Sequence, residues 1–424
     1  MKRKIFLAIA IIVTSLQLYG EDFIEGSTPS GLAYVFSMPD CLPNCTSADQ
    51  EKINTNSRLE QIPIEAIQSA RESVNFAQFT FSRQNIFHAL VDAHARGVVV
   101  RGVVWENSFP NLRQFCGNGS GRCSFNFEPL NTTSYVQSGI EKRKQLLQNL
   151  QLYQNATMSE RLALLFYRSP TGSEVRPVGG TNATQHNKFV LVDNSMVATG
   201  SGNWSSTAIG INLENLLLFY DSTTINAFHC IFEMMWSNRL NRTSVGRCQT
   251  DSILFTPASD TLAAILVAIK DSKHMIEISM HHLSHPQILK ALALAARSGV
   301  KVHLLTDDDD CITSLTSNLR ALLSNRNVTL EYVQTNCEIF QLAHNKFGIF
   351  DRSFVINGAG NWSISGLQDN LENSQIITEP NLVRAFIRNF EMTSQYVVSR
   401  NVCTCNPRDP ACRAHYCLDR EFNN

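Results

Sequence analysis

Residues 186–205 read HNKFVLVDNSMVATGSGNWS, and residues 344–363 read HNKFGIFDRSFVINGAGNWS. Twelve of the twenty positions are identical, and the two segments are 158 residues apart. The match continues at the same offset with NLEN, which begins at Asn212 and again at Asn370. Repetition of this length predicts two structurally similar units within one chain.

A second echo lies upstream of each segment. IFHALVDAHARGVVVRGVVW at 86–105 resembles ILKALALAARSGVKVHLLT at 288–306, and Gly97 occupies the place of Gly299. Each stretch is typical of a helix, a glycine stop and a β-branched strand. Alternating helices and strands predict an α/β fold. We therefore expect two similar α/β lobes, packed about a pseudo-twofold axis, with one shared active site.

The repeat also predicts the organisation of the chain. We expect a first lobe over 22–245 and a second over 250–400, with a short joint at 248–260. The two glycines are 202 residues apart, which is 44 more than the offset of the later segments. The first lobe should therefore carry an insertion within 107–180, with an amphipathic helix near 139–165.

The first twenty residues predict export. Lys2, Arg3 and Lys4 precede an apolar run, and a small-residue cleavage position follows near Gly20, which is the layout of a signal peptide over 1–20. The alternative is a retained signal anchor, although the run is short for a span of about 20 residues. We expect a secreted protein, or one in another oxidising exported compartment.

The twelve cysteines agree with export, because an even number in an exported chain predicts disulfides. The tail over 401–424 is Cys-rich, and its cluster CTCNPRDPACRAHYC favours a disulfide-stapled tail over a zinc site. The net charge of −1 gives no overall basic field that would indicate a nucleic-acid partner, although a local basic groove stays open.

The repeated segment carries groups suited to phosphate chemistry. HNKFVLVD is typical of a strand, in which side chains two apart face the same way, so His186 and Lys188 should project together. His344 and Lys346 should do the same. A lysine can neutralise a phosphate while the histidine beside it attacks or transfers a proton.

The end of each segment adds further candidates. GSGN and GAGN predict tight turns that bring the backbone close to an anion, and Asn203 and Asn361 can donate to a phosphoryl oxygen. Glu214 and Glu372 each lie 28 residues beyond a histidine. A carboxylate on the far ring nitrogen would orient a histidine and raise its basicity.

Other polar residues favour structural interpretations. Asp193 and Asp351 should face away from the histidines, which favours an ion pair or a turn. The acidic run at 306–311 is more typical of a solvated loop than of a cation site. The histidines of MHHLSH could form a metal site, but no carboxylate spacing supports one; they are His281, His282 and His285.

The duplicated His-x-Lys-x4-Asp pattern resembles the phospholipase D superfamily, and the wording GSGNWSS…NLEN is similar to its nuclease and cardiolipin-hydrolase branch. The resemblance implies that one histidine attacks phosphorus, that the other protonates the leaving alcohol, and that no metal or other cofactor is required. By motif, it implies a catalytic set of His186, His344, Lys188, Lys346, Glu214 and Glu372, and a phosphate-binding set of Asn203, Asn361 and Ser201.

One position departs from the family pattern. Ser or Thr is usual where this chain has Ala359, whereas the first segment keeps Ser201. One lost hydrogen bond is worth about 0.5–1.5 kcal/mol, far less than a lost imidazole. If the two halves do unequal work, Ser201 marks the half that holds the nucleophile.

These features favour a secreted phospholipase D-type phosphodiesterase, with phospholipid as the preferred substrate and peripheral contact with a membrane. The alternative is a nuclease acting on DNA or RNA. A non-catalytic binding protein is disfavoured because both His-Lys pairs are intact. Since both half-sites lie in one chain, we expect a monomer.

Overall fold

The computed structural model describes residues 22–28, 31, 33–116, 122–125, 134–148, 150–180, 183–258, 260–307, 317–336 and 339–398. The predicted signal peptide, the Cys-rich tail and residues 308–311 of the acidic run lie outside the described residues. Within these ranges, no helix is both long and apolar enough to span a bilayer.

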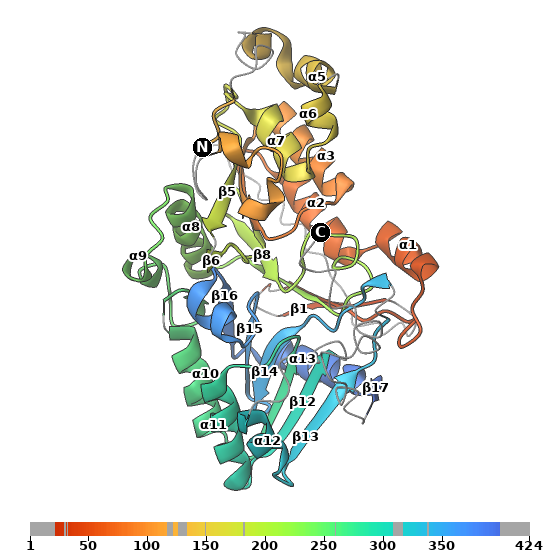
Figure 1. Cartoon of the computed structure of the whole chain (residues 1–424), viewed down its shortest axis with the longest axis vertical. Coiled ribbons are helices and arrows are strands. Elements are labelled where there is room, and N and C mark those ends of the chain that lie inside the picture. Colours follow the sequence, from red (N-terminus) through yellow and green to blue (C-terminus); the bar gives the residue numbers. More distant parts are fainter. Residues whose placement is uncertain are drawn as a thin grey trace, which may run out of the picture.

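Two mixed sheets form the framework, one above the other in Figure 1. In spatial order, the nine-stranded sheet contains β1 (Phe23–Ser27), β2 (Ala33–Ser37), β9 (Asn215–Phe219), β8 (Met196–Gly200), β7 (Phe189–Val192), β3 (Ser73–Gln78), β4 (Val99–Trp105), β5 (Glu174–Gly180) and β6 (Ala183–Thr184). The eight-stranded sheet contains β10 (Ile253–Phe255), β16 (Asn373–Ile377), β15 (Phe354–Gly358), β14 (Lys346–Phe350), β11 (Met275–Met280), β12 (Lys301–Asp307), β13 (Val328–Val333) and β17 (Val397–Val398). We call the parts of the chain built on these sheets the first and second halves.

The two halves are built alike. Parallel strands β3 and β4 are joined by α3 (Gln84–Ala95), and parallel strands β11 and β12 by α11 (Pro286–Arg297). Gly97 and Gly299 follow these helices with φ of +92° and +101°, a left-handed conformation that favours glycine. The predicted α/β fold with an internal duplication is confirmed.

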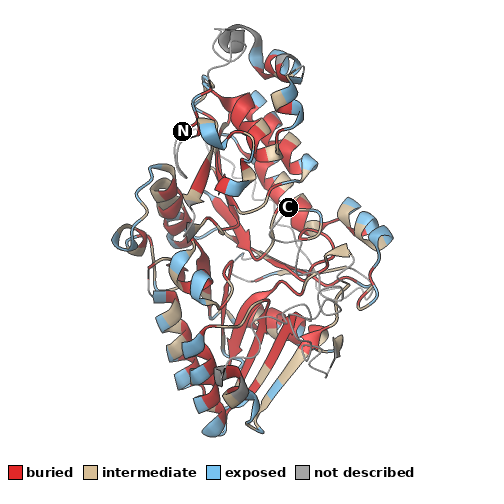
Figure 2. Cartoon of the chain, in the orientation of Figure 1, coloured by how far each residue is buried: buried red, intermediate tan, exposed pale blue. Residues whose placement is uncertain are grey.

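Apolar residues of both halves pack together between the sheets. Helix α13 (Pro380–Thr393) brings Phe386 within 4.9 Å of Phe36 on β2, measured between ring centroids. Helix α8 (Ser222–Trp236) brings Phe228 within 5.4 Å of Phe255 on β10. Through these contacts the two halves share a core, which Figure 2 shows as buried residues at the centre. Burying each such ring contributes about 1.5–3 kcal/mol.

The insertion in the first half contains three helices instead of the single helix expected at 139–165. They are α5 (Ser134–Gln148), α6 (Gln151–Gln154) and α7 (Met158–Phe166), at the top of Figure 1. The backbone is non-helical at Gly139. Thr157 then caps a new helix in a capping box with Glu160, which explains the break.

The remaining α-helices cover the sheets. They are α1 (Ser47–Thr55), α2 (Arg58–Ser69), α9 (Arg242–Gly246), α10 (Asp260–Asp271) and α12 (Ser317–Leu323). The expected joint at 248–260 is part of the second sheet, because β10 within it pairs with β16. Three disulfides occur among the described residues: Cys41–Cys45, Cys116–Cys123 and Cys230–Cys248.

Candidate active site

The segments that carry the two histidines are hydrogen-bonded to the opposite half of the chain. The backbone N–H of His186 donates to the carbonyl of Leu371 at 3.0 Å, and that of His344 donates to Leu213 at 3.1 Å. Each leucine directly precedes one of the candidate glutamates. The backbone therefore brings each histidine beside the glutamate of the other half.

Asparagines of the repeated HNK and LEN segments reinforce this arrangement. Nδ2 of Asn373 donates to Oδ1 of Asn187 at 2.8 Å, and Nδ2 of Asn215 donates to Oδ1 of Asn345 at 2.9 Å. All four side chains are buried, where an unmade hydrogen bond costs about 1–3 kcal/mol. The repeat of HNK and LEN thus has a structural reason, since each HNK contacts the LEN of the other half.

Each histidine is paired with a carboxylate across the boundary between halves. Nδ1 of His186 lies 2.8 Å from the carboxylate of Glu372, and Nδ1 of His344 lies 2.7 Å from Oε1 of Glu214. Both carboxylates are almost fully buried. The sequence predicted supporting glutamates, but the structure places neither of them with the histidine of its own half.

The two lysines are held in the same way in both halves. Nζ of Lys188 donates to the carbonyl of His186 at 2.7 Å, and Nζ of Lys346 donates to the carbonyl of His344 at 2.7 Å. The strands begin only at Phe189 and Lys346, so His186 and Lys188 lie just before β7, outside the strand. Both ammonium groups are buried beside the histidines.

Burial dominates the electrostatics of this cluster. Burial lowers the pKa of Lys188 to about 7, with Glu372 opposing the shift and Lys346 adding to it. Burial likewise raises the pKa of Glu214 to about 7. It lowers the pKa of His186, against the effect of Glu372, and lowers the pKa of His344 well below its ordinary value. Both imidazoles are therefore neutral near pH 7.

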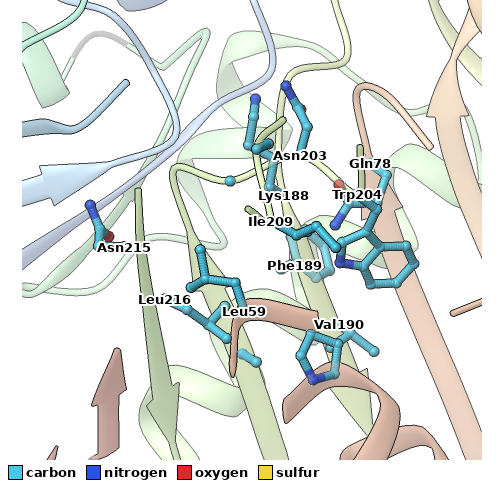
Figure 3. A pocket seen from close by; sticks show the side chains of 14 residues that line it. Leu59, Gln78, Lys188, Phe189, Val190, Asn203, Trp204, Ile209, Asn215 and Leu216 are labelled. Atoms are coloured by element: carbon cyan, nitrogen blue, oxygen red, sulfur yellow. The ribbon is translucent and has the colours of Figure 1, made fainter. Parts of the chain in front are cut away.

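The glycine turns place the candidate asparagines. A Cβ on Gly200 would lie 1.9 Å from the carbonyl oxygen of Asn215, so the first glycine is required by the close approach of two backbones, not by an anion. In Figure 3 the side chains of Lys188 and Asn203 point the same way, away from the apolar side chains at the other end of a cavity. That cavity is about 20 Å³, room for roughly one water, so it is too small to hold a substrate phosphate.

Ser201 contacts residues of its own half, and its effect reaches the other half through Glu214. Its hydroxyl is fully buried and accepts from the backbone N–H of Asn215 at 2.9 Å. A hydrogen bond from Ser201 also lowers the pKa of Glu214, against the larger effect of burial. Glu214 is the partner of His344. The Ser201 hydroxyl, which has no counterpart at Ala359, therefore supports the histidine of the other half.

The two motif aspartates have a structural position, as expected. The carboxylate of Asp193 accepts from the backbone N–H groups of Arg71, Glu72 and Ser73 at 2.8 Å. Asp351 accepts from the equivalent N–H groups at the start of β11 at 2.7–2.9 Å. Each aspartate therefore fixes the turn after its histidine strand to the start of the neighbouring strand.

Sequence reasoning missed an aromatic pair beside His186. The ring of Phe79 lies 4.7 Å from that of His186 and stacks on Trp105 at 4.6 Å. Nζ of Lys188 lies 5.3 Å from the centre of the Phe79 ring. Phe79 directly follows β3 and Trp105 ends β4, so the ends of the two predicted strands could have indicated both residues.

The histidines of MHHLSH also lie near the site. His281 directly follows β11, and its ring is 4.9 Å from that of His344 and 3.9 Å from that of His282. Nε2 of His285 instead meets the amide of Gln368 at 3.0 Å. Among the described residues, no group of three or more His, Cys, Asp or Glu is arranged to hold a metal ion.

Two similar α/β halves that share one buried cluster of histidine, lysine and glutamate define the class of this protein as a duplicated fold with a composite site. The family described as "Cardiolipin synthase, PLD-like domain" matches residues 64–236 and 265–393. The chain belongs to this family of the phospholipase D superfamily, which confirms the resemblance seen in the sequence.

Individual relatives agree on the family. The chain is 28% identical over 134 residues to the mitochondrial cardiolipin hydrolase of Mus musculus, covering 32% of this chain and 58% of that protein. It is 24% identical over 210 residues to the phospholipase D of Rickettsia prowazekii, covering 49% of this chain and 93% of that protein. The chain spans about half the length of the cardiolipin hydrolases it matches, from 49% to 58% in the mouse, dog and human proteins.

Solved structures share the fold at low sequence identity. The polyphosphate kinase of Porphyromonas gingivalis has a TM-score of 0.56 at 13% identity, over 89% of this chain and 51% of that one. The phosphatidylserine synthase of Haemophilus influenzae has a TM-score of 0.54 at 9% identity, over 84% of this chain and 92% of that one. These likenesses extend over both halves and concern the fold alone.

Proposed function

We propose that the protein is a phosphodiesterase of the phospholipase D type that works through a phosphohistidine. The observation that carries the proposal is the crosswise pairing of two histidines with two buried carboxylates, beside two buried lysines. Carboxylates on both Nδ1 atoms direct both Nε2 atoms to the substrate. Two imidazoles presented in this way suit a nucleophile and a proton donor.

In the first step, Nε2 of His186 attacks phosphorus. The P–N bond forms, the P–O bond to the leaving alcohol breaks, and the alcohol oxygen takes the proton from Nε2 of His344. A bound phosphodiester anion raises the pKa of His344, which allows it to hold that proton. In the second step, His344 removes a proton from water, the water oxygen bonds to phosphorus, and the P–N bond breaks.

Ser201 supports this assignment of the two histidines. By hydrogen-bonding Glu214 it favours the ionised carboxylate, and an ionised Glu214 stabilises the protonated His344 needed in the first step. Ala359 gives Glu372 no equivalent hydroxyl. His186 is therefore the better candidate for the neutral nucleophile.

The four remaining site residues bind the phosphate oxygens. Lys188 and Lys346 supply positive charge in a buried place, where it acts more strongly than in water. Asn203 and Asn361 donate from the glycine turns at the ends of β8 and β15. None of these steps uses a metal or another cofactor.

A phospholipid is the proposed substrate. Relatives named phospholipase D and cardiolipin hydrolase support it. The second candidate is a nuclease, which the stacked and half-buried pair of Phe79 and Trp105 favours, because such rings can stack on a base.

The test compares cardiolipin, phosphatidylcholine and single-stranded DNA as substrates of the purified protein, with and without EDTA. We expect the protein to release phosphatidic acid from a lipid substrate. EDTA should leave the rate of this release unchanged. Cleavage of DNA alone would replace the lipid substrate by the second candidate. Loss of activity in EDTA would contradict the metal-free steps.

Export and a monomeric state are part of the same proposal. The disulfides among the described residues suit an oxidising compartment. We expect the mature chain to begin after Gly20, with lobes over 22–245 and 250–400, and to contact membranes only at the surface. N-terminal sequencing of the exported protein and light scattering in solution test these points.

A further inference from the structure

The two halves of the site differ in what lies against each histidine. Strand register fixes the comparison, because Ala77 pairs with Phe189 and Ser279 pairs with Phe347 at the same place in the two sheets. Phe79 in the first half is therefore equivalent to His281 in the second. By the same register, Trp105 at the end of β4 is equivalent to Asp307 at the end of β12.

These substitutions give the two sides opposite chemistry. Beside His186, the rings of Phe79 and Trp105 form an aromatic wall. Beside His344, the rings of His281 and His282 form what we call the imidazole wall. The carboxylate of Asp307 accepts from the backbone N–H of Ala343, so it anchors the residue before His344 and does not extend the wall.

His281 is costly where it lies. Its side chain is only 5% exposed, and its Nδ1 has no hydrogen-bond partner among the residues that the structure describes. The equivalent phenylalanine shows that an apolar ring fits the same place in this fold. A buried polar atom without a partner destabilises a protein unless a ligand satisfies it, which indicates a role in binding.

The reaction supplies a ligand that fits. A phosphodiester carries two different alcohols, and in-line attack by His186 puts the leaving alcohol on the side of His344. Burial and the neighbouring His282 and His344 lower the pKa of His281 well below its usual value, so it is a neutral imidazole with one donor and one acceptor. A neutral imidazole can accept from an alcohol hydroxyl, or donate to the alcohol oxygen from its other nitrogen.

We propose that His281, together with His282, binds the leaving alcohol and determines which alcohols the site accepts. This inference rests on the proposed phosphohistidine mechanism. It makes His281 a specificity-determining residue, while His344 transfers the proton. By microscopic reversibility, the same wall binds an alcohol that replaces water in the second step. That alcohol gives its proton to His344, its oxygen bonds to phosphorus, and the P–N bond breaks.

The experiment measures this partition with a substrate that is independent of lipid or nucleic acid. Bis(4-nitrophenyl) phosphate forms the phosphohistidine in the presence of glycerol, and the ratio of 4-nitrophenyl phosphoglycerol to 4-nitrophenyl phosphate is determined. His281→Phe places the residue of the first half at the equivalent position. We expect this variant to lower the ratio about tenfold, as the loss of one good hydrogen bond would.

Two further variants make the result specific. His281→Gln keeps a donor and an acceptor, and should stay within about threefold of the wild-type ratio. His303→Phe removes an imidazole of the same sheet that pairs with Glu331 instead, and should leave the ratio unchanged. These comparisons hold even if His281→Phe proves less stable.

The possible failures are distinguishable. Absence of a glycerol product from the wild type, or an unchanged ratio in His281→Phe, would overturn the role of the imidazole wall. Absence of nitrophenol release from the wild type would instead overturn the proposed function itself.

Discussion

Replacing Lys188 by methionine should make the fold more stable while it abolishes activity. Burial lowers the pKa of this lysine from 10.5 to about 7, and each pKa unit corresponds to about 1.4 kcal/mol. A buried ammonium with a depressed pKa therefore costs the folded state about 4–5 kcal/mol at pH 7. The lost hydrogen bond to the carbonyl of His186 offsets about 1.5–3 kcal/mol of the gain.

We therefore expect Lys188→Met to raise the free energy of unfolding by about 1–3.5 kcal/mol at pH 7. The stability associated with a lysine of depressed pKa is present above pH 10.5 and is lost as pH falls toward 7. The gain should accordingly shrink as pH rises and be absent near pH 10. Urea unfolding with the disulfides intact measures it, and Lys290→Met, at an exposed position on α11, is the matched control. A variant less stable than wild type at pH 7, or a gain independent of pH, would show that burial of the Lys188 ammonium does not destabilise the fold.

Three further predictions follow from the site. Glu214→Gln should gain stability relative to wild type as pH rises from 4.5 through 7, by about 3 kcal/mol, because the raised carboxyl pKa makes ionisation costly in the fold; urea midpoints at pH 5 and 8 measure this. Glu372→Gln should move the acidic limb of the kcat/KM profile to lower pH, because Glu372 raises the pKa of His186. An unmoved limb would show that Glu372 does not control the protonation of His186. Asp193→Asn should lower the free energy of unfolding by about 1–3 kcal/mol with kcat retained, and a large loss of kcat in the folded variant would give Asp193 a chemical role.

The repeated segment made the fold predictable. Twelve identities in twenty positions indicated the duplication, and the glycine stops at 97 and 299 indicated two equivalent strand connections. The single helix expected at 139–165 was wrong because its apolar spacing continues across a break. Thr157 and Glu160 have the Thr-x-x-Glu spacing of a capping box, so a signal for a new helix start was present in the sequence.

The candidate residues were predictable, but their partners were not. Glu214 lies 28 residues after His186, and this spacing is the same in both halves. Equal spacing cannot indicate which half a side chain faces, because the contact depends on packing of the two sheets. The structure decides it through the backbone hydrogen bonds that Leu213 and Leu371 make across the boundary.

The asymmetry of the site was harder to see. The 202-residue offset of the two glycines also relates Phe79 to His281, so the comparison was available from the sequence. The sequence could not show that these two residues lie beside His186 and His344. Both follow strand ends, and their distance from the histidines depends on the order of strands in each sheet. Register in β3 and β11 supplied that information.

In the proposed mechanism, one site assembled from both halves forms a phosphohistidine on His186 and uses His344 for proton transfer. His344→Asn, mixed with bis(4-nitrophenyl) phosphate, isolates the first step, because nitrophenol leaves without a proton donor while water lacks its base. We predict a burst of nitrophenol stoichiometric with enzyme, acid-labile phosphate on the peptide that contains His186, and no burst from His186→Asn. A burst from His186→Asn, or none from either variant when the wild type turns over, would contradict the account.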